Sequence, residues 1–259
     1  MDPPADLARM PWFDEHPVDA AGLLAAMDTA GVHGAVLVQA KGAYGFDNSC
    51  AADARAIAPH RLANASIIDM GSTERIDRLE YWAVERGMLG TRLFNIPPAS
   101  PVWLDDPATA GMLARCRSLG VRVALCILAG DMPLVRDLCT MAGDVPVALD
   151  HCGFVDLLGD TRALDALADV PNLHLKVTTT LLEPALRADR DPRELLERLC
   201  NVFGVERLMW GSDYPQHHSE PYAEIVDLAR HACSRLTPAE QARFLGGTAL
   251  SVWPELTPR

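Results

Sequence analysis

The sequence has 259 residues, of which 49% are apolar and 22% charged, and it is long enough to bury the core of one large domain. The formal net charge of −12 opposes binding to a phosphate backbone, and no cluster of Lys and Arg offsets it, so we expect no nucleic-acid partner. No apolar run approaches the roughly 18 residues of a membrane span, and the first residues lack the pattern of a secretory signal, so we expect no membrane partner.

Seven cysteines are scattered along the chain without a CxxC pair, and several lie in apolar stretches, where a free thiol packs as a small hydrophobic side chain. This distribution is typical of a reducing compartment. We therefore expect a cytoplasmic protein with a single domain over residues 1–259.

Apolar runs of strand length alternate with amphipathic helical stretches along the whole chain. The predicted strands are 33–39, 61–69, 88–94, 120–127, 145–153, 172–177 and 207–213. The predicted helices are 18–30, 49–58, 73–86, 108–119, 131–142, 161–169, 192–203, 221–232 and 238–245. Because most of the strands are continuous apolar runs, we expect a parallel α/β sheet that helices cover on both faces.

Two architectures fit this alternation, a (β/α)8 TIM-type barrel and a doubly wound open sheet. An open sheet usually carries a glycine-rich phosphate turn after an early strand, and VQAKGAYGFDNS (38–49) contains neither GxGxxG nor GxxxxGK[ST]. A barrel instead collects polar side chains at the C-terminal ends of its strands. The sequence has such side chains there, which favours the barrel: Gln39, Arg92, Asp150, His151, Lys176 and Asp213.

Each of these residues also has a purely structural interpretation. Asp213 could simply cap a turn, since aspartate is common there. The stretch LMWGSDYPQHH (208–218), however, places it directly after a predicted buried strand. Pro215 restricts Tyr214 to an extended backbone and so fixes the direction in which the chain leaves the strand. Arg92 and Lys176 lie between apolar residues, and a buried cation needs an anion from the protein or from a substrate. His217 and His218 follow the proline in a polar loop, where a solvated role is favoured.

Four segments together resemble the amidohydrolase-related lactonases, the branch that contains 2-pyrone-4,6-dicarboxylate lactonase and sugar-lactone hydrolases. They are VALDHCGF (147–154), NLHLKVT (172–178), ERLMWGSDYP (206–215) and FLGGTALSVW (244–253). The resemblance implies a distorted TIM barrel, with His151 and Asp213 at the positions of the family's site histidine and aspartate. It also implies that Arg92 binds an anion. We expect a substrate-binding role for Arg92 and for three further residues, Gln39, Lys176 and Tyr214.

The sequence departs from this family at its front, because no His-x-His occurs anywhere in it. The remaining zinc ligands are His151 and Asp213, with Cys126 or Cys152 as further possibilities, and two ligands bind zinc weakly. We therefore expect no required cofactor, with one divalent metal, zinc, as the alternative. A barrel of seven strands would leave an open seam, and we expect that the true start lies upstream or that a neighbouring subunit or a terminal segment covers the seam. A homo-oligomer is accordingly an open prediction.

The expected reaction is hydrolysis of a lactone or related cyclic carboxylate, so that the expected partner is a small-molecule carboxylate or lactone. Asp213 would accept a proton from the attacking water, His151 would donate a hydrogen bond to the carbonyl oxygen or orient the water, and Arg92 would hold a substrate carboxylate. Two alternatives remain, a metal-dependent decarboxylase of an aromatic or enol acid and a degenerate barrel that binds a small acid without catalysis. The expected pocket-lining loops, 40–48, 95–106 and 178–192, do not identify the substrate.

Overall fold

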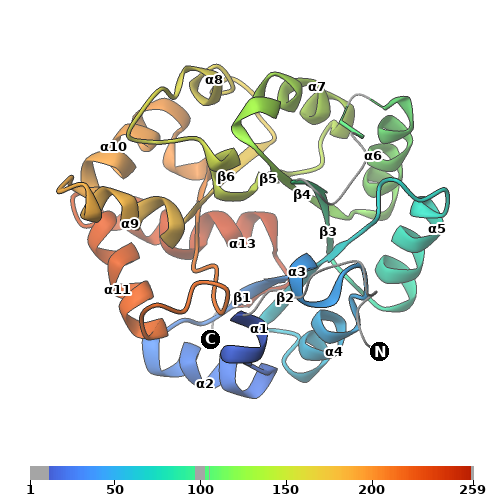
Figure 1. Cartoon of the computed structure of the whole chain (residues 1–259), viewed down its shortest axis with the longest axis horizontal. Coiled ribbons are helices and arrows are strands. Elements are labelled where there is room, and N and C mark those ends of the chain that lie inside the picture. The colour runs from blue at the N-terminus through green and yellow to red at the C-terminus, as the bar shows by residue number, and fades with distance from the viewer. Residues whose placement is uncertain (1–11, 97–102, 105, 258–259) are drawn as a thin grey trace.

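The structure is a computed structural model that describes residues 12–96, 103–104 and 106–257. Its centre is a parallel sheet whose strands follow one another in chain order and curl into a TIM-type α/β barrel (Figure 1). The strands are β1 (Ala35–Val38), β2 (Leu62–Ile67), β3 (Gly90–Asn95), β4 (Arg122–Ile127), β5 (Val147–Leu149), β6 (Leu173–Thr178) and β7 (Leu208–Gly211). The predicted strands and their parallel pairing are confirmed.

Helices surround the sheet on its outer side (Figure 1). The α-helices are α1 (Trp12–Glu15), α2 (Ala20–Ala30), α3 (Lys41–Tyr44), α4 (Ser49–Ile57), α5 (Arg75–Glu80), α6 (Pro107–Leu119), α7 (Met132–Ala142), α8 (Arg162–Asp165), α9 (Thr179–Arg187), α10 (Pro192–Phe203), α11 (Tyr222–Ala232), α12 (Pro238–Ala242) and α13 (Thr248–Val252). Shorter π and 3₁₀ turns are η1 (Tyr81–Glu85), η2 (Ala129–Asp131), η3 (Asp150–Phe154), η4 (Val205–Arg207) and η5 (Arg243–Gly247). In the part of the chain that the structure describes, no helix has the length and apolar character to cross a membrane.

The expectation of loops at 40–48 and 178–192 is wrong in part. Residues 41–44 form α3, and residues 179–187 form α9 although Pro184 lies inside that helix. Helix α9 persists because Leu182 and Ala185, three residues apart on one face, are fully buried against the rest of the fold. Most of the third expected loop, 95–106, lies outside the described residues.

The N-terminal end of the barrel is filled by the residues that follow β7. Ala63, Ala65 and Met209 line the interior, and Trp253 packs among them. A Cβ on Gly90, the first residue of β3, would lie 2.4 Å from a ring carbon of Trp253, so only glycine permits this approach. At the start of β4, Arg122 donates to the carbonyl oxygen of Val252 at 3.0 Å and its guanidinium lies 5.6 Å from the Trp253 ring. The C-terminal segment therefore forms a packed floor under the barrel.

The sheet is open between β1 and β7, and helices close this seam from outside. No strand pairs with β1 on its free edge within residues 12–96, 103–104 and 106–257. Helices α2 and α11 pack against each other there around Met27 and Tyr222. Arg230 of α11 also donates to the carbonyl oxygen of Ala30 at the end of α2, at 2.7 Å.

Helix α1 lies across the seam at the other end of the barrel. The ring of Phe13 packs edge-on against Tyr44 of α3 at 4.8 Å, and His16 packs against His218 of the loop after β7 at 3.9 Å. A segment near the N-terminus thus joins the first and last barrel units, in agreement with the expected cover by a terminal segment. An upstream start and a homo-oligomer stay predictions.

We predict that Trp253→Ala lowers the free energy of unfolding by about 3–5 kcal/mol, because truncation of a buried tryptophan leaves a cavity that the strands cannot close. Urea denaturation measures this loss. Ile57→Ala is the matched control, since the Ile57 side chain is 66% exposed and its removal should change stability by no more than about 0.5 kcal/mol. Equal effects of the two substitutions would contradict the role of Trp253 as the floor of the barrel.

Candidate active site

The polar strand-end residues meet at the C-terminal mouth of the barrel, as expected. Arg92 lies on β3 and Lys176 on β6. Asp150 directly follows β5, and Asp213 lies two residues after the end of β7. Asp150 contacts Arg92 at 2.7 Å and Lys176 at 3.5 Å, and Cys126 on β4 lies 3.1 Å from Arg92, so side chains from four neighbouring strands meet here. Parallel strands bring their C-terminal ends to the same edge, so residues far apart in sequence converge here.

A buried ion pair network organises the mouth. The carboxylate of Asp150, 1% exposed, accepts from Nε of Arg92 at 2.7 Å and lies 3.5 Å from Nζ of Lys176. Burial alone would raise the pKa of Asp150, but the charges of Lys176 and Arg92 outweigh it and hold the pKa below its usual value. Asp150 is therefore the anion that these two partly buried cations require.

Cys126 and Cys152 are buried thiols rather than thiolates. Burial raises the pKa of each to about 12. Arg92 directs its Nη2 towards Sγ of Cys126 at 3.1 Å, and Sγ of Cys152 donates to the carbonyl oxygen of Lys176 at 3.8 Å. Both thiols fill space beside the ion pair network.

His151 lies on an unusual backbone turn that follows β5. Residues 151–154 have φ values between 47° and 65°, so His151, Cys152, Gly153 and Phe154 are all left-handed. Such a conformation costs on the order of 1–2 kcal/mol per non-glycine residue. The ring of Phe154 stacks on that of His151 at 4.5 Å. The turn aims the imidazole at the mouth instead of along the strand direction.

The imidazole of His151 is buried and neutral at pH 7. Burial lowers its pKa to about 4, and the charge of Lys176 adds to this effect more strongly than Asp213 opposes it. Nδ1 makes a 2.9 Å hydrogen bond with the hydroxyl of Thr178, while Nε2 faces Oδ1 of Asp213 at 3.7 Å. The ring therefore presents one nitrogen to the mouth, opposite a carboxylate.

Asp213 also has a left-handed backbone, with φ of 59°. Its carbonyl oxygen accepts from the backbone N–H of His217 at 2.8 Å, which closes the loop after β7 into a turn. The side chain is 15% exposed, so it lies near the mouth rather than in the core. Left-handed non-glycine residues often cluster at functional sites, and here they include both residues for which we expect a catalytic role.

The structure places the other expected substrate-binding residues differently. Gln39 is buried and its amide donates to the carbonyl oxygen of Asp47 at 2.7 Å, so it supports the chain after β1. Tyr214 packs against Tyr222 at 5.0 Å in the cluster between α2 and α11. Substrate contact by Gln39 and Tyr214 stays a prediction.

Lys41 is a buried cation whose position could not be inferred from the motifs in the sequence. It follows the end of β1, and its Nζ lies 4.8 Å from the ring of Phe94, the same ring that the guanidinium of Arg92 approaches at 5.3 Å. Burial lowers the pKa of Lys41, while Asp69 and Cys126 oppose this. Apart from such motifs, the sequence feature that could have indicated Lys41 is its position two residues after Gln39, just beyond the end of a strand.

The donor set at this mouth does not fit a zinc ion. Zinc sites use three or four N, O or S ligands, and His151 and Asp213 supply two. Within the described ranges, the groups of three or more His, Cys, Asp or Glu side chains with ligand atoms close together lie elsewhere, around His217 and His218. Two cationic side chains, Arg92 and Lys176, also border the site.

This geometry can be compared with known proteins. A family model described as amidohydrolase matches residues 2–254. The chain belongs to the amidohydrolase family. The resemblance noted from the four sequence segments is thereby confirmed at the level of the family.

The curated relatives are two proteins named L-fucono-1,5-lactonase. The one from Burkholderia ambifaria is 34% identical over 93 residues, which are 34% of this chain and 32% of that protein. The one from Burkholderia multivorans is 37% identical over 95 residues, with the same coverage. The match spans about a third of the length of these relatives.

Solved structures support the fold over nearly the whole chain. An amidohydrolase from Burkholderia multivorans with bound zinc has a TM-score of 0.76 at 20% identity and covers 98% of this chain and 96% of its own. A protein from Acinetobacter baumannii named "probable 2-pyrone-4,6-dicarboxylic acid hydrolase", with citric acid bound, has a TM-score of 0.73 at 18% identity, over 91% and 89%. A 5-carboxyvanillate decarboxylase from Sphingomonas paucimobilis has a TM-score of 0.71 at 17% identity, over 96% and 87%. At these identities the likeness shows the fold alone.

We predict that His151 makes the protein less stable as the pH falls from about 6.5 to about 4. The unfolded chain takes up a proton near the ordinary pKa of 6.5, whereas the folded chain resists protonation down to about 4, so stability is lost across this window by up to about 3 kcal/mol. His151→Gln should flatten the pH dependence of urea unfolding in that window. His231→Gln, which removes an exposed imidazole, should keep the slope of the unaltered protein. An unchanged slope in His151→Gln would show that the folded imidazole titrates normally.

Proposed function

We propose that this chain hydrolyses a lactone or related cyclic carboxylate, with Asp213 as the base for the attacking water. The observation that carries the proposal is the neutral imidazole of His151, which faces the Asp213 carboxylate at 3.7 Å beside the partly buried cations Arg92 and Lys176. A water molecule beside both groups can hydrogen bond to each of them, because the two atoms are too far apart to satisfy one another.

The chemistry follows from these positions. The water oxygen attacks the lactone carbonyl carbon, its proton passes to Asp213, and the carbonyl π electrons move to the oxygen. Nδ1 of His151 contacts a hydroxyl, so it can accept from Thr178 and leave a proton on Nε2 for donation to the developing oxyanion. The ring C–O bond then breaks and the leaving oxygen takes the proton from Asp213. The product is a hydroxy acid.

The charges at the mouth favour a substrate with a carboxylate. Arg92, Lys41 and Lys176 bring three cationic side chains to the mouth of a chain whose net charge is −12, and Arg92 and Lys176 both contact Asp150. Asp69 and Asp213 add negative charge near these cations. A cationic side chain can hold a substrate carboxylate by a charge-assisted hydrogen bond even in a chain of negative net charge.

The two alternatives from the sequence stay predictions. A metal-dependent decarboxylase needs a metal at the reacting centre, and the donors around His151 do not form such a set. A barrel that only binds a small acid would keep the cations and show no turnover. A panel of pyrone dicarboxylates and sugar lactones, assayed with and without added zinc, separates the three possibilities.

We predict that Asp213→Asn lowers kcat on the preferred lactone by orders of magnitude while stability changes little, because asparagine tolerates the same left-handed backbone but accepts no proton. Steady-state hydrolysis and urea denaturation provide the two measurements. Asp189→Asn is the matched control, since Asp189 is an exposed aspartate with a φ of 53°. Undiminished turnover by Asp213→Asn would remove Asp213 from the mechanism.

We also predict that Lys41→Met raises KM for a carboxylated lactone by about tenfold or more, since a charge-assisted hydrogen bond is worth roughly 1.5–3 kcal/mol. KM for an uncharged sugar lactone should change much less. Arg162→Met removes a cation whose side chain is 90% exposed and should leave both values unchanged. The same increase for both substrates would argue against recognition of a carboxylate by Lys41.

A further inference from the structure

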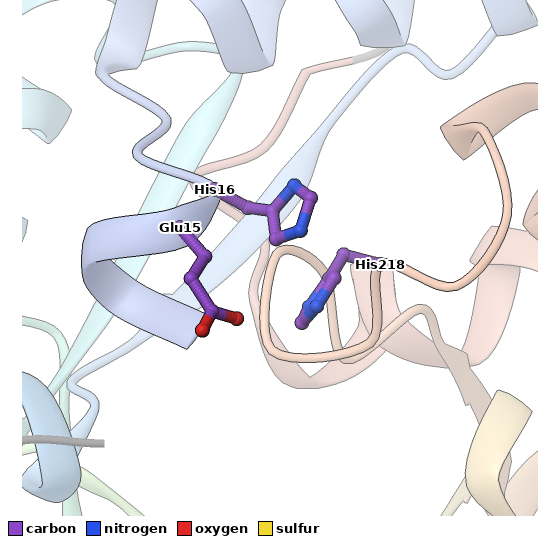
Figure 2. A group of neighbouring side chains, drawn as sticks. All are labelled: Glu15, His16 and His218. Carbon is purple, nitrogen blue, oxygen red and sulfur yellow. The ribbon is translucent and has the colours of Figure 1, made fainter. Parts of the chain in front are cut away.

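A second group of side chains that could bind a metal ion lies on the rim of the barrel, where the C-terminal end of α1 meets the loop after β7. Glu15 and His16 belong to the first segment and His218 to the second, and the three side chains point towards one another (Figure 2). One ligand atom from each lies within 4.8 Å of the other two. The residues come from segments that are about 200 positions apart, so the tertiary fold assembles the group.

The hydrogen bonds of His218 leave one nitrogen available as a ligand. Its Nδ1 lies 3.1 Å from the carbonyl oxygen of Pro215 and 3.0 Å from that of Gln216. Carbonyl oxygens only accept, so Nδ1 carries the proton and Nε2 keeps its lone pair. A backbone carbonyl that fixes the tautomer in this way is the usual support of a metal-binding histidine.

The other two side chains differ from His218 in their polar contacts. In the described part of the chain, neither the carboxylate of Glu15 nor the ring nitrogens of His16 take part in a hydrogen bond or an ion pair. The contact of His16 is with the ring of His218, at 3.9 Å between centroids and 31° between planes. Three possible metal ligands thus lie close together without a hydrogen bond between them.

The neighbouring group around His217 differs, because its side chains contact one another. Nε2 of His217 lies 2.9 Å from a carboxylate oxygen of Glu183 and 3.2 Å from one of Glu220. In these contacts the imidazole N–H can donate to the carboxylate oxygens, and a metal would have to displace that proton. The group around His217 is therefore explained by its own contacts, whereas the group around His218 is not.

We propose that Glu15, His16 and His218 form a binding site for a divalent transition metal, with zinc as the best match. Two imidazoles and one carboxylate are a ligand set that zinc prefers, and three protein ligands leave a fourth position for water. The site is separate from the pair His151 and Asp213, and it does not depend on the proposed lactone hydrolysis.

The metal would connect two segments that border the open seam. Helix α1 contacts α3 through Phe13, and the loop after β7 leads into α11. A metal bound to both would fix α1 over the gap between β1 and β7. Because the folded chain presents these ligands together and the unfolded chain does not, binding stabilises the fold.

Cobalt titration tests the site directly. The full chain, prepared without a histidine tag and stripped of metal with a chelator, is titrated with Co²⁺ while its visible absorption is recorded, since a site with two imidazoles and a carboxylate gives a distinct d–d spectrum. Zn²⁺ competition and the shift of the thermal midpoint with Zn²⁺ follow. We expect one ion per chain and a higher midpoint in zinc.

Four variants identify the ligands. His16→Ala and His218→Ala should each weaken Co²⁺ binding by about tenfold or more and abolish the zinc-dependent shift, while circular dichroism of the metal-free variants stays unchanged. His231→Ala, the loss of an exposed imidazole elsewhere, should bind as the unaltered protein does. Glu15→Gln keeps the shape of the side chain and should weaken binding to a smaller degree.

The proposal is overturned if the chain shows no cobalt spectrum, or if the spectrum survives His16→Ala and His218→Ala unchanged. Loss of binding in His217→Ala or His151→Gln, but not in those two variants, would assign the metal to another site and equally overturn it. Lactone turnover is not a readout here, so failure of the metal site leaves the proposed hydrolysis intact.

Discussion

The carboxylate of Asp150 lies between the guanidinium of Arg92 and the ammonium of Lys176, and the mouth of the barrel is arranged around this buried network. It joins the ends of β3, β5 and β6 and compensates charges that could not otherwise be buried. It also affects the next residue, because the charge of Lys176 adds to the effect of burial in lowering the pKa of His151. A carboxylate with no place in the proposed reaction therefore contacts a cation that helps to keep His151 neutral.

The two ends of the barrel have different roles, one in stability and the other in function. The floor is apolar and close-packed around Trp253, with Arg122 tied to the last segment of the described chain. The mouth carries the charged groups, the left-handed residues and the short turn after β7. Membership of the amidohydrolase family agrees with this division, since barrel enzymes place their chemistry at the C-terminal ends of the strands. Changes at the floor should act on folding, and changes at the mouth on substrates.

The sequence predicted the strands well because apolar runs flanked by turns have few other solutions. It also predicted that Arg92, His151, Lys176 and Asp213 lie at the same end of the sheet, because each ends or follows such a run; their roles stay predictions. It did not predict that Asp150 pairs with Arg92, since the two are 58 residues apart and only the curl of the sheet brings them together. The burial of Lys41 likewise depends on Phe94 from another strand. Helix α9 was missed, and its stability depends on the burial of Leu182 and Ala185 against the rest of the fold. The left-handed turn at 151–154 contains only one glycine, so the sequence gives little sign of it.

The closure of the seam has a consequence for synthesis of the protein on the ribosome. Helix α2 is completed early, but its partner α11 and the Arg230 contact to Ala30 come 200 residues later. At roughly 5–20 residues per second, that separation corresponds to about 10–40 seconds of elongation. Throughout this time the free edge of β1 and the apolar face of α2 have no partner and are open to pairing with other chains. The first units of the nascent chain should therefore stay exposed until the last helices have been synthesised.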